Sequence, residues 1–139
     1  MVIGTEEQDA FIREHSFAIV TTLRKDGSPT NSAVFVMLDG DDITFSTTED
    51  RLKTRTIEND SRVAVTLADG AEPYRYLTVE GSGSIQRDNI VPAHIELNRM
   101  MRGDATWEPP ENFEEMLKKQ GRLIVRVKSQ RVSGILNRP

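Results

Sequence analysis

The chain has 139 residues, of which 37% are hydrophobic and 29% are charged, and its formal net charge is -4. This size and balance predict a single domain, residues 1–139, that buries a core without cross-links. The acidic net charge argues against general nucleic-acid binding. The absence of cysteine excludes disulfides, thiolate catalysis and cysteine-ligated metals.

Nothing in the sequence indicates a membrane protein. No stretch approaches the roughly 18 apolar residues of a membrane-spanning helix. The first residues, Met1 to Gln8, lack the basic and then apolar pattern of a secretion signal. We therefore expect a cytoplasmic protein without a membrane partner, and the lack of disulfides agrees with that location.

The chain begins with a predicted short helix and continues mainly as strands. Thr5 followed by Gln8 is typical of a capping box, and the helix should end near His15. A strand from Phe17 to Leu23 follows, and the Asp26-Gly27 pair predicts a hairpin turn. Further strands are expected at Thr30 to Leu38, Ile43 to Ser46, Arg62 to Ala68, Tyr74 to Gln86 and Leu123 to Val127, with a short extension at Val132 to Leu136.

Helices are few and short in this pattern. They are predicted at about Asp50 to Asn59, at Ile90 to Met101, and around Phe113 to Leu117 before Gly121. Gly81 and Gly83 inside a strand predict a bulge or a bend. Hairpin-linked strands indicate a mainly β, antiparallel sheet, and about six strands in one small domain usually close into a barrel.

A cluster of cations stands where a strand gives way to a helix. Hydroxyl side chains at Ser46, Thr47 and Thr48 precede Arg51, Lys53 and Arg55. A helix start presents free N–H groups, and cationic side chains add charge-assisted hydrogen bonds, so the segment predicts a phosphate site. The alternative is a capped helix with solvated charges, in which Glu49 and Asp50 supply the acids that a helix start prefers.

Side-chain catalytic constellations are largely missing. His15 and His94 are the two histidines, and neither has a metal-ligand partner three or four residues away. We therefore expect no metal. No nucleophile elbow or Walker loop occurs. If the protein is an enzyme, a bound cofactor should carry the reactive chemistry.

Three aromatic residues are candidates for a role at a ligand pocket. Tyr74 and Tyr76 are two apart and should point to the same face of one strand, where they either touch a cofactor ring or cover the barrel's end. Trp107, in a polar loop flanked by prolines, is predicted to close a pocket as a lid or to plug the barrel's end.

The order of these motifs resembles a known family. The strand, Asp-Gly turn, strand, hairpin and strand precede Arg51 to Arg55, and Asn59 to Val65 and Leu77 to Gly81 follow. Together they resemble the flavin-binding split β-barrel superfamily of pyridoxamine 5'-phosphate oxidase, and most of all its small enzymes that use the deazaflavin coenzyme F-420. The resemblance implies a six-stranded Greek-key split barrel and a homodimer with cofactor sites at the subunit interface.

The resemblance also implies roles for single residues. Lys53, and next Arg51, match residues that hold the cofactor's phosphate, and Arg55 is a further candidate. The other matching positions are Ser46 to Thr48 beside the phosphate and ribityl chain, Thr30 and Ser32 beside the ring, and Tyr74 and Tyr76 near the ring or the substrate. The segment Ser133 to Pro139 lacks the substrate-phosphate signature of pyridoxamine phosphate oxidases proper, which argues against the pyridoxal phosphate reaction.

Three functions remain open at this stage. The first is an F-420-dependent reductase that delivers hydride to a conjugated small molecule, with Tyr76 as a possible proton donor and Arg13, Lys118 or Lys119 as cations for the cofactor's acidic tail. The second is an FMN-binding oxidoreductase on the same fold. The third is a non-catalytic carrier of a cofactor or tetrapyrrole.

Overall fold

The computed structural model describes residues 3–137 as seven strands and four short helices. The strands are β1 (Phe17–Leu23), β2 (Pro29–Phe35), β3 (Met37–Asp39), β4 (Asp42–Thr48), β5 (Arg62–Asp69), β6 (Arg75–Gln86) and β7 (Arg122–Ile135). The helices are α1 (Glu6–Glu14), α2 (Leu52–Asn59), α3 (Val91–Arg102) and α4 (Phe113–Lys119). The mainly β prediction is confirmed.

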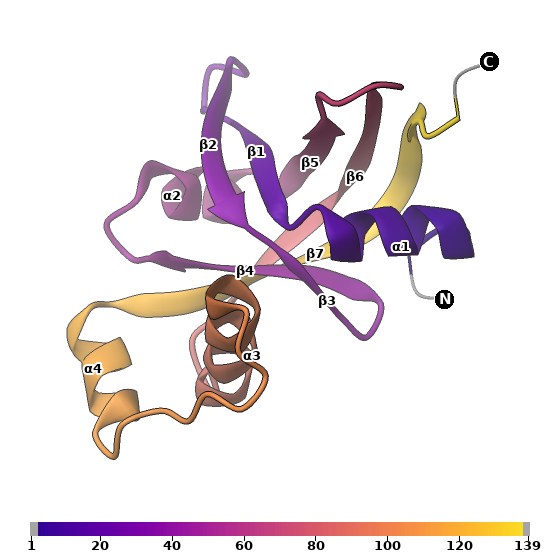
Figure 1. Cartoon of the computed structure of the whole chain (residues 1–139). Coiled ribbons are helices and arrows are strands. Elements are labelled where there is room, and N and C mark those ends of the chain that lie inside the picture. Colours follow the sequence, from indigo (N-terminus) through magenta and orange to yellow (C-terminus); the bar gives the residue numbers. More distant parts are fainter. Residues whose placement is uncertain (1–2, 138–139) are drawn as a thin grey trace.

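All strands form one antiparallel sheet in the order β2-β1-β5-β6-β7-β4-β3. Although β2 and β3 lie at opposite ends of this order, only Val36 separates them along the chain. The sheet must therefore curl until its edges approach each other, as Figure 1 shows. This is the predicted split barrel, with seven strands instead of six.

The extra strand comes from a break in a segment that was predicted to be continuous. Thr30 to Leu38 divides at Val36, which is fully buried and whose N–H donates to the carbonyl of Ser16 at 2.7 Å. Before the break the segment pairs with β1, and after it with β4. The residue thus redirects the chain from one edge of the sheet to the other.

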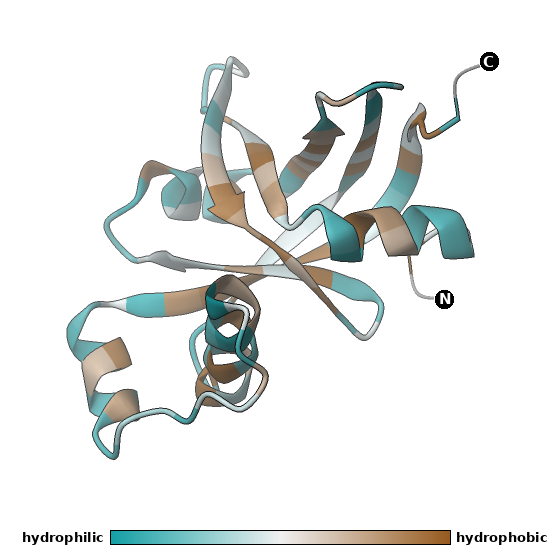
Figure 2. Cartoon of the chain, in the orientation of Figure 1, coloured by the Kyte–Doolittle hydropathy of each residue, from teal (hydrophilic) through white to brown (hydrophobic). Residues whose placement is uncertain are grey.

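Alternation along β4 separates the barrel interior from its outside. Ile43, Phe45 and Thr47 point inward and are buried, whereas Ser46 and Thr48 are half-buried on the opposite side. The barrel core also contains apolar side chains from β1, β5, β6 and β7, among them Val20, Val65, Leu77, Val79 and Val125. In Figure 2 the paired strands β4 and β7 show hydrophobic segments between neutral and hydrophilic ones.

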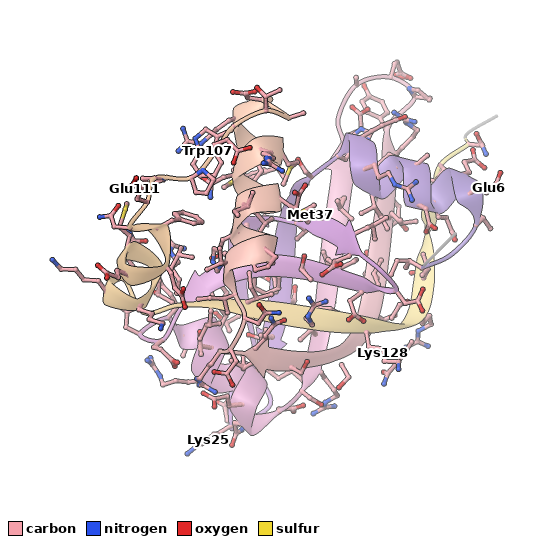
Figure 3. All side chains as sticks on the ribbon, turned by 90° about the horizontal axis from the view of Figure 1, so that it is seen from below. Glu6, Lys25, Met37, Trp107, Glu111 and Lys128 are labelled. Carbon is pink, nitrogen blue, oxygen red and sulfur yellow. The ribbon has the colours of Figure 1, made fainter. Side chains whose placement is uncertain are left out.

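A second, smaller core lies between α3, α4 and the outer face of β7. It is built on Leu97, Phe113, Leu117 and Ile124, with Trp107 packed against it. The Trp107 ring meets Phe113 edge-on at 5.7 Å between centroids, and Figure 3 shows Trp107 beside α3. Trp107 therefore belongs to the helical cluster, and its predicted plugging of the barrel's end is wrong.

Local predictions at the N-terminal helix and at the strand glycines are confirmed. Thr5 and Gln8 form the capping box, and His15 follows α1 as its C-cap. The β6–β7 register shifts between Glu80 and Gly81, which is the predicted bulge. Leu123 to Val127 and Val132 to Leu136 were predicted as two pieces, but the single strand β7 contains the first piece whole and the second as far as Ile135.

One predicted strand boundary is wrong in a way that matters for function. Tyr74 has φ of 51° and lies before β6, which begins at Arg75. Tyr74 and Tyr76 therefore do not share one face of a regular strand. Separately, no helix in residues 3–137 is long and apolar enough to cross a membrane.

The bulge at Gly81 gives a test of the sheet. A Cβ at this position would stand 2.0 Å from the carbonyl oxygen of Lys128, a backbone atom that cannot move aside cheaply. We expect Gly81→Ala to lower the free energy of unfolding by about 1–3 kcal/mol, the usual cost of overpacking. Urea unfolding measures this difference.

Gly70→Ala is the matched control, because a Cβ at this position would meet no atom within 4 Å and its φ is not in the left-handed region. It should change the free energy of unfolding by less than about 0.5 kcal/mol. Equal unfolding midpoints for both variants would contradict the account of the bulge.

Candidate active site

A cavity of about 510 Å³ opens where β4 ends and α2 begins. Its walls come from β2, β4, α2, α3, α4 and the first residue of β7. The lining residues are Ser32, Ala33, Val34, Phe35, Ser46, Thr47, Thr48, Arg51, Lys53, His94, Leu97, Asn98, Met101, Leu117 and Arg122. Segments distant in sequence therefore meet at the predicted phosphate segment.

The register between β4 and β7 brings a further cation, Arg122, to this cavity. Thr48 pairs with Arg122 in the β4–β7 ladder, and Ser46 pairs with Ile124. Directly opposed residues in an antiparallel pair share one face of the sheet. The outer face of the barrel thus carries Ser46, Thr48 and Arg122 side by side.

Threonines fix α2 against the barrel. The Thr54 hydroxyl donates to the carbonyl of Thr48 at 2.8 Å, and the Thr56 hydroxyl lies 2.7 Å from that of Thr22 on β1. Both Thr54 and Thr56 are buried. Because these bonds hold one face of the helix inward, Lys53 stays at the cavity.

Three cations line the cavity. Arg51, Lys53 and Arg122 all contribute to its wall, and among the described residues the lining set contains no carboxylate. Burial lowers the pKa of Lys53 from its usual value, and the charges of Arg51 and Arg122 lower it further. A cation that is both desolvated and surrounded by like charge is the arrangement expected at a site for an anion.

The two acids that precede α2 lie outside the cavity lining and have partners of their own. Glu49 accepts from Arg87 at 2.6 Å, and Asp50 accepts a short hydrogen bond from the Thr48 hydroxyl. The first turn of α2 contains no acid, and no side chain caps it. Helix α2 itself therefore lacks the side-chain cap and the first-turn acid that a purely structural helix prefers, and its start favours an anion.

A histidine from α3 forms part of the cavity wall. His94 is only 3% exposed. Its Nδ1 lies 2.6 Å from the carbonyl of Ile90, and its Nε2 lies 2.7 Å from the Ser46 hydroxyl. Burial lowers the pKa of His94, the bond to Ile90 raises it, and the nearby charge of Arg122 lowers it.

The structure gathers most of the predicted phosphate residues and one residue, Ser32, that was predicted beside the cofactor ring. Ser32, Ser46, Thr47, Thr48, Arg51 and Lys53 all line the cavity, although the Thr47 side chain itself faces the barrel core. Their contact with a ligand stays a prediction.

Other predicted site residues lie outside this cavity. Arg55 donates to the backbone carbonyl of Asp50 at 3.1 Å, and Thr30 pairs with Thr22 within the β1–β2 hairpin. Tyr74 and Tyr76 lie at the opposite part of the sheet, where Tyr76 pairs with Ala68. The lining also omits the predicted lid Trp107 and the tail cations Arg13, Lys118 and Lys119; Lys118 pairs with Glu114 at 3.3 Å.

Sequence reasoning missed Arg122, His94 and Asn98. Arg122 begins a strand whose register is invisible in the sequence. His94 was judged only by metal-ligand spacing, whereas its partner Ser46 lies 48 positions away. The one available signal was a polar residue within the apolar pattern of α3.

A second groove, also about 510 Å³, lies over β1, β5, β6 and β7. Its charges are already neutralised, because Arg131 pairs with Glu80 at 2.8 Å and Arg62 pairs with Asp60 at 2.7 Å. It therefore lacks the unbalanced charge of the first cavity. In the part of the chain that the structure describes, no group of three or more His, Asp or Glu side chains could hold a metal ion.

Known proteins of similar structure include one with a deazaflavin-related name. An F420 reductase is 28% identical, with a TM-score of 0.71 and coverage of 90% of this chain and 94% of that one. The conserved hypothetical protein Rv2991 from Mycobacterium tuberculosis is 19% identical, with a TM-score of 0.79 and coverage of 96% and 85%. General Stress Protein 26 from Bacillus anthracis is 18% identical, with a TM-score of 0.68 and coverage of 94% and 92%. The last two show likeness of fold alone.

A comparison with curated proteins finds no match. The family model for pyridoxamine 5'-phosphate oxidase matches residues 5–135, which is nearly the whole chain. The split barrel, its motif order and this match agree, so the chain belongs to the pyridoxamine 5'-phosphate oxidase family and has the fold of its flavin-type oxidoreductases.

Proposed function

We propose that this protein is an oxidoreductase that uses the deazaflavin coenzyme F-420 and transfers hydride to a conjugated small-molecule acceptor. The observation that carries the proposal is the cavity in which Arg51, Lys53 and Arg122 stand together without a carboxylate. The 28% identical F420 reductase supports deazaflavin as the first cofactor to test.

The donor set fits the phosphate of such a cofactor. Two guanidinium groups and an ammonium offer charge-assisted hydrogen bonds, and the uncapped start of α2 adds backbone N–H groups. An anion would also relieve the repulsion that lowers the pKa of Lys53. Ser32 and Phe35 on β2 extend the wall beyond the cations, where the rest of a cofactor would lie.

The chain's own residues would bind and position the reactants. When bound in its reduced form, the deazaflavin supplies the hydride. The protein would anchor the cofactor at Lys53, hold its ring against the acceptor and exclude water, which accounts for rate enhancement without a nucleophilic side chain. The roles of Tyr76 as proton donor, and of Thr30 and Tyr74 beside the ring, stay predictions.

FMN is the alternative cofactor, because it shares the phosphoribityl group that the cavity recognises. A non-catalytic carrier of a cofactor or tetrapyrrole would use the same cavity without turnover. The cytoplasmic location and the absence of nucleic-acid or membrane partners also stay predictions.

We propose further that two copies of the chain form a homodimer that completes the site. Phe17, Ile19 and Phe35 are 57%, 42% and 42% exposed on neighbouring strands, and the rings of Phe17 and Phe35 lie 5.1 Å apart. Phe35 also lines the cavity. Exposed apolar side chains that gather in this way mark a contact surface, and a second copy seated there would lie beside the cofactor.

The first test separates the three functions. Purified protein is titrated with F-420 and, separately, with FMN by fluorescence, and reduced cofactor is then mixed with enones, quinones and biliverdin. We expect micromolar or tighter binding of F-420 and its oxidation by at least one acceptor. Preference for FMN would favour the alternative cofactor, binding without turnover would favour the carrier, and binding of neither would refute the cofactor site.

Lys53→Ala tests the phosphate contact. We expect it to weaken F-420 binding by about 1.5–3 kcal/mol, the range for hydrogen bonds to charged groups. Arg55→Ala is the matched control, since Arg55 stands on the same helix but outside the cavity. Arg55→Ala should lose less F-420 binding free energy than Lys53→Ala, because solvent and salt screen an exposed charge. Unchanged affinity in folded Lys53→Ala would sink the phosphate assignment.

Ile19→Asp tests the dimer, because it places a charge in the exposed apolar surface without touching the cavity lining. Light scattering after size exclusion should show a shift from dimer to monomer, with weaker F-420 binding. Met116→Asp is the control, since Met116 is 37% exposed on α4 and does not belong to the group of Phe17, Ile19 and Phe35. A monomeric wild-type protein would exclude the dimer outright.

A further inference from the structure

A buried hydrogen-bond chain connects the phosphate cavity to α3. The Ser46 hydroxyl on β4 lies 2.7 Å from Nε2 of His94, and Nδ1 of the same ring lies 2.6 Å from the carbonyl oxygen of Ile90. Arg122 approaches the Ser46 oxygen from the cavity side at 3.5 Å. Ser46 lines the cavity, whereas His94 is almost completely buried behind it.

While the His94 ring is neutral, the donor and acceptor of each of these hydrogen bonds are fixed by the chemistry of the groups. A carbonyl oxygen only accepts, so Nδ1 carries the ring proton, and Nε2 must then accept the proton of Ser46. The guanidinium of Arg122 only donates. The single proton of Ser46 therefore points away from the cavity, and the hydroxyl presents lone pairs to whatever binds there.

An anion in the cavity meets an unfavourable hydroxyl in this state. Thr48 cannot compensate, because its own proton is donated to Asp50. A second proton on His94 would reverse the arrangement, since Nε2–H would donate to the Ser46 oxygen and release the serine proton toward the anion. The imidazolium would also add positive charge behind the site.

We propose that the Ser46–His94 pair makes anion binding in this cavity proton-linked: as the anion binds, His94 takes up one proton and the Ser46 hydroxyl turns to donate to the anion. His94 is thus a positioning residue that acts through Ser46. The inference rests on the proposed phosphate site but concerns its regulation by pH. Linkage is reciprocal. The bound anion therefore raises the affinity of His94 for a proton by the same factor as the proton raises the affinity of the cavity for the anion.

The surrounding charges support this direction. The charge of Arg122 on β7 opposes a proton on His94 until an anion neutralises it. Lys53 on α2 and Arg51 before that helix line the same cavity. The charged neighbours on α3 itself are already paired, with Glu96 bound to Arg99 at 3.0 Å. On β7, Arg126 is paired with Asp39 at 2.7 Å. Asn98, which is neutral, donates to the backbone carbonyl of His94 at 2.8 Å.

The test uses inorganic sulfate, whose charge is constant over the range in which histidine titrates. Histidine ring resonances of the wild-type protein are followed by NMR between about pH 5 and pH 8, with and without sulfate. The chain has two histidines, and His15→Gln assigns them. We expect sulfate to raise the pKa of His94, and the His15 resonances serve as the internal control.

Calorimetry measures the same linkage from the side of the anion. Sulfate affinity should rise by up to about tenfold for each unit of pH decrease between the two pKa values of His94, with uptake of up to one proton. His94→Gln should abolish this dependence while His15→Gln preserves it. Ser46→Ala should weaken sulfate binding more at low pH than at high pH, because the serine hydroxyl donates to the anion only when His94 is protonated.

The outcomes are distinct. An identical His94 titration with and without sulfate, equal pH dependence in wild type and His94→Gln, or no sulfate binding at any pH would each overturn the proposal. The wild-type NMR result stands even if His94→Gln fails to fold. Failure of the proposed function would appear differently, as sulfate-linked proton uptake in a protein that binds neither F-420 nor FMN.

Discussion

The single residue between β2 and β3 constrains the whole molecule. Since Val36 is the only residue between strands at opposite edges of the sheet, the edges are held near each other and the sheet has to curl. The same constraint brings β2 beside the C-terminal end of β4. Ser32 and Phe35 therefore share a cavity with Ser46 and Lys53. A flat sheet of these strands would place them apart. The cavity is thus a consequence of barrel closure.

Each face of the strands that leave the barrel serves a different purpose. The inner face of β4 contributes Phe45 and Thr47 to the barrel, and the outer face contributes Ser46 and Thr48 to the cavity. On β7, Arg122 faces the cavity, while Ile124 two residues later is covered by the helical cluster. Helices α3 and α4 therefore do more than cover the sheet, because they supply the back wall of the cavity through His94 and Leu117.

Sequence reasoning was accurate for several features whose signal is local. The Asp26-Gly27 turn, the Thr5 and Gln8 cap and the Gly81 bulge are read from a few adjacent residues, and the structure contains all three. The placement of Lys53 and Arg51 follows likewise from one strand-to-helix junction. Arg122 and His94 could not be found in this way, because strand register and helix docking decide their position. Tyr74 was wrongly placed inside the strand because its β propensity is high. Its left-handed backbone, at φ of 51°, keeps it outside β6, which begins at the next residue.

The cavity also imposes an energetic cost on the folded protein. Lys53 loses water on folding and gains two like charges at close range, both of which oppose its protonated form. The start of α2 adds the positive end of the helix dipole. Folding tolerates this arrangement because Thr54 and Thr56 anchor the helix through bonds that do not involve charge. Any anion that binds removes part of the cost and so stabilises the folded state by its binding free energy. The unbalanced charge is therefore better explained by a ligand than by stability, because a helix selected for stability alone would carry an acid in its first turn.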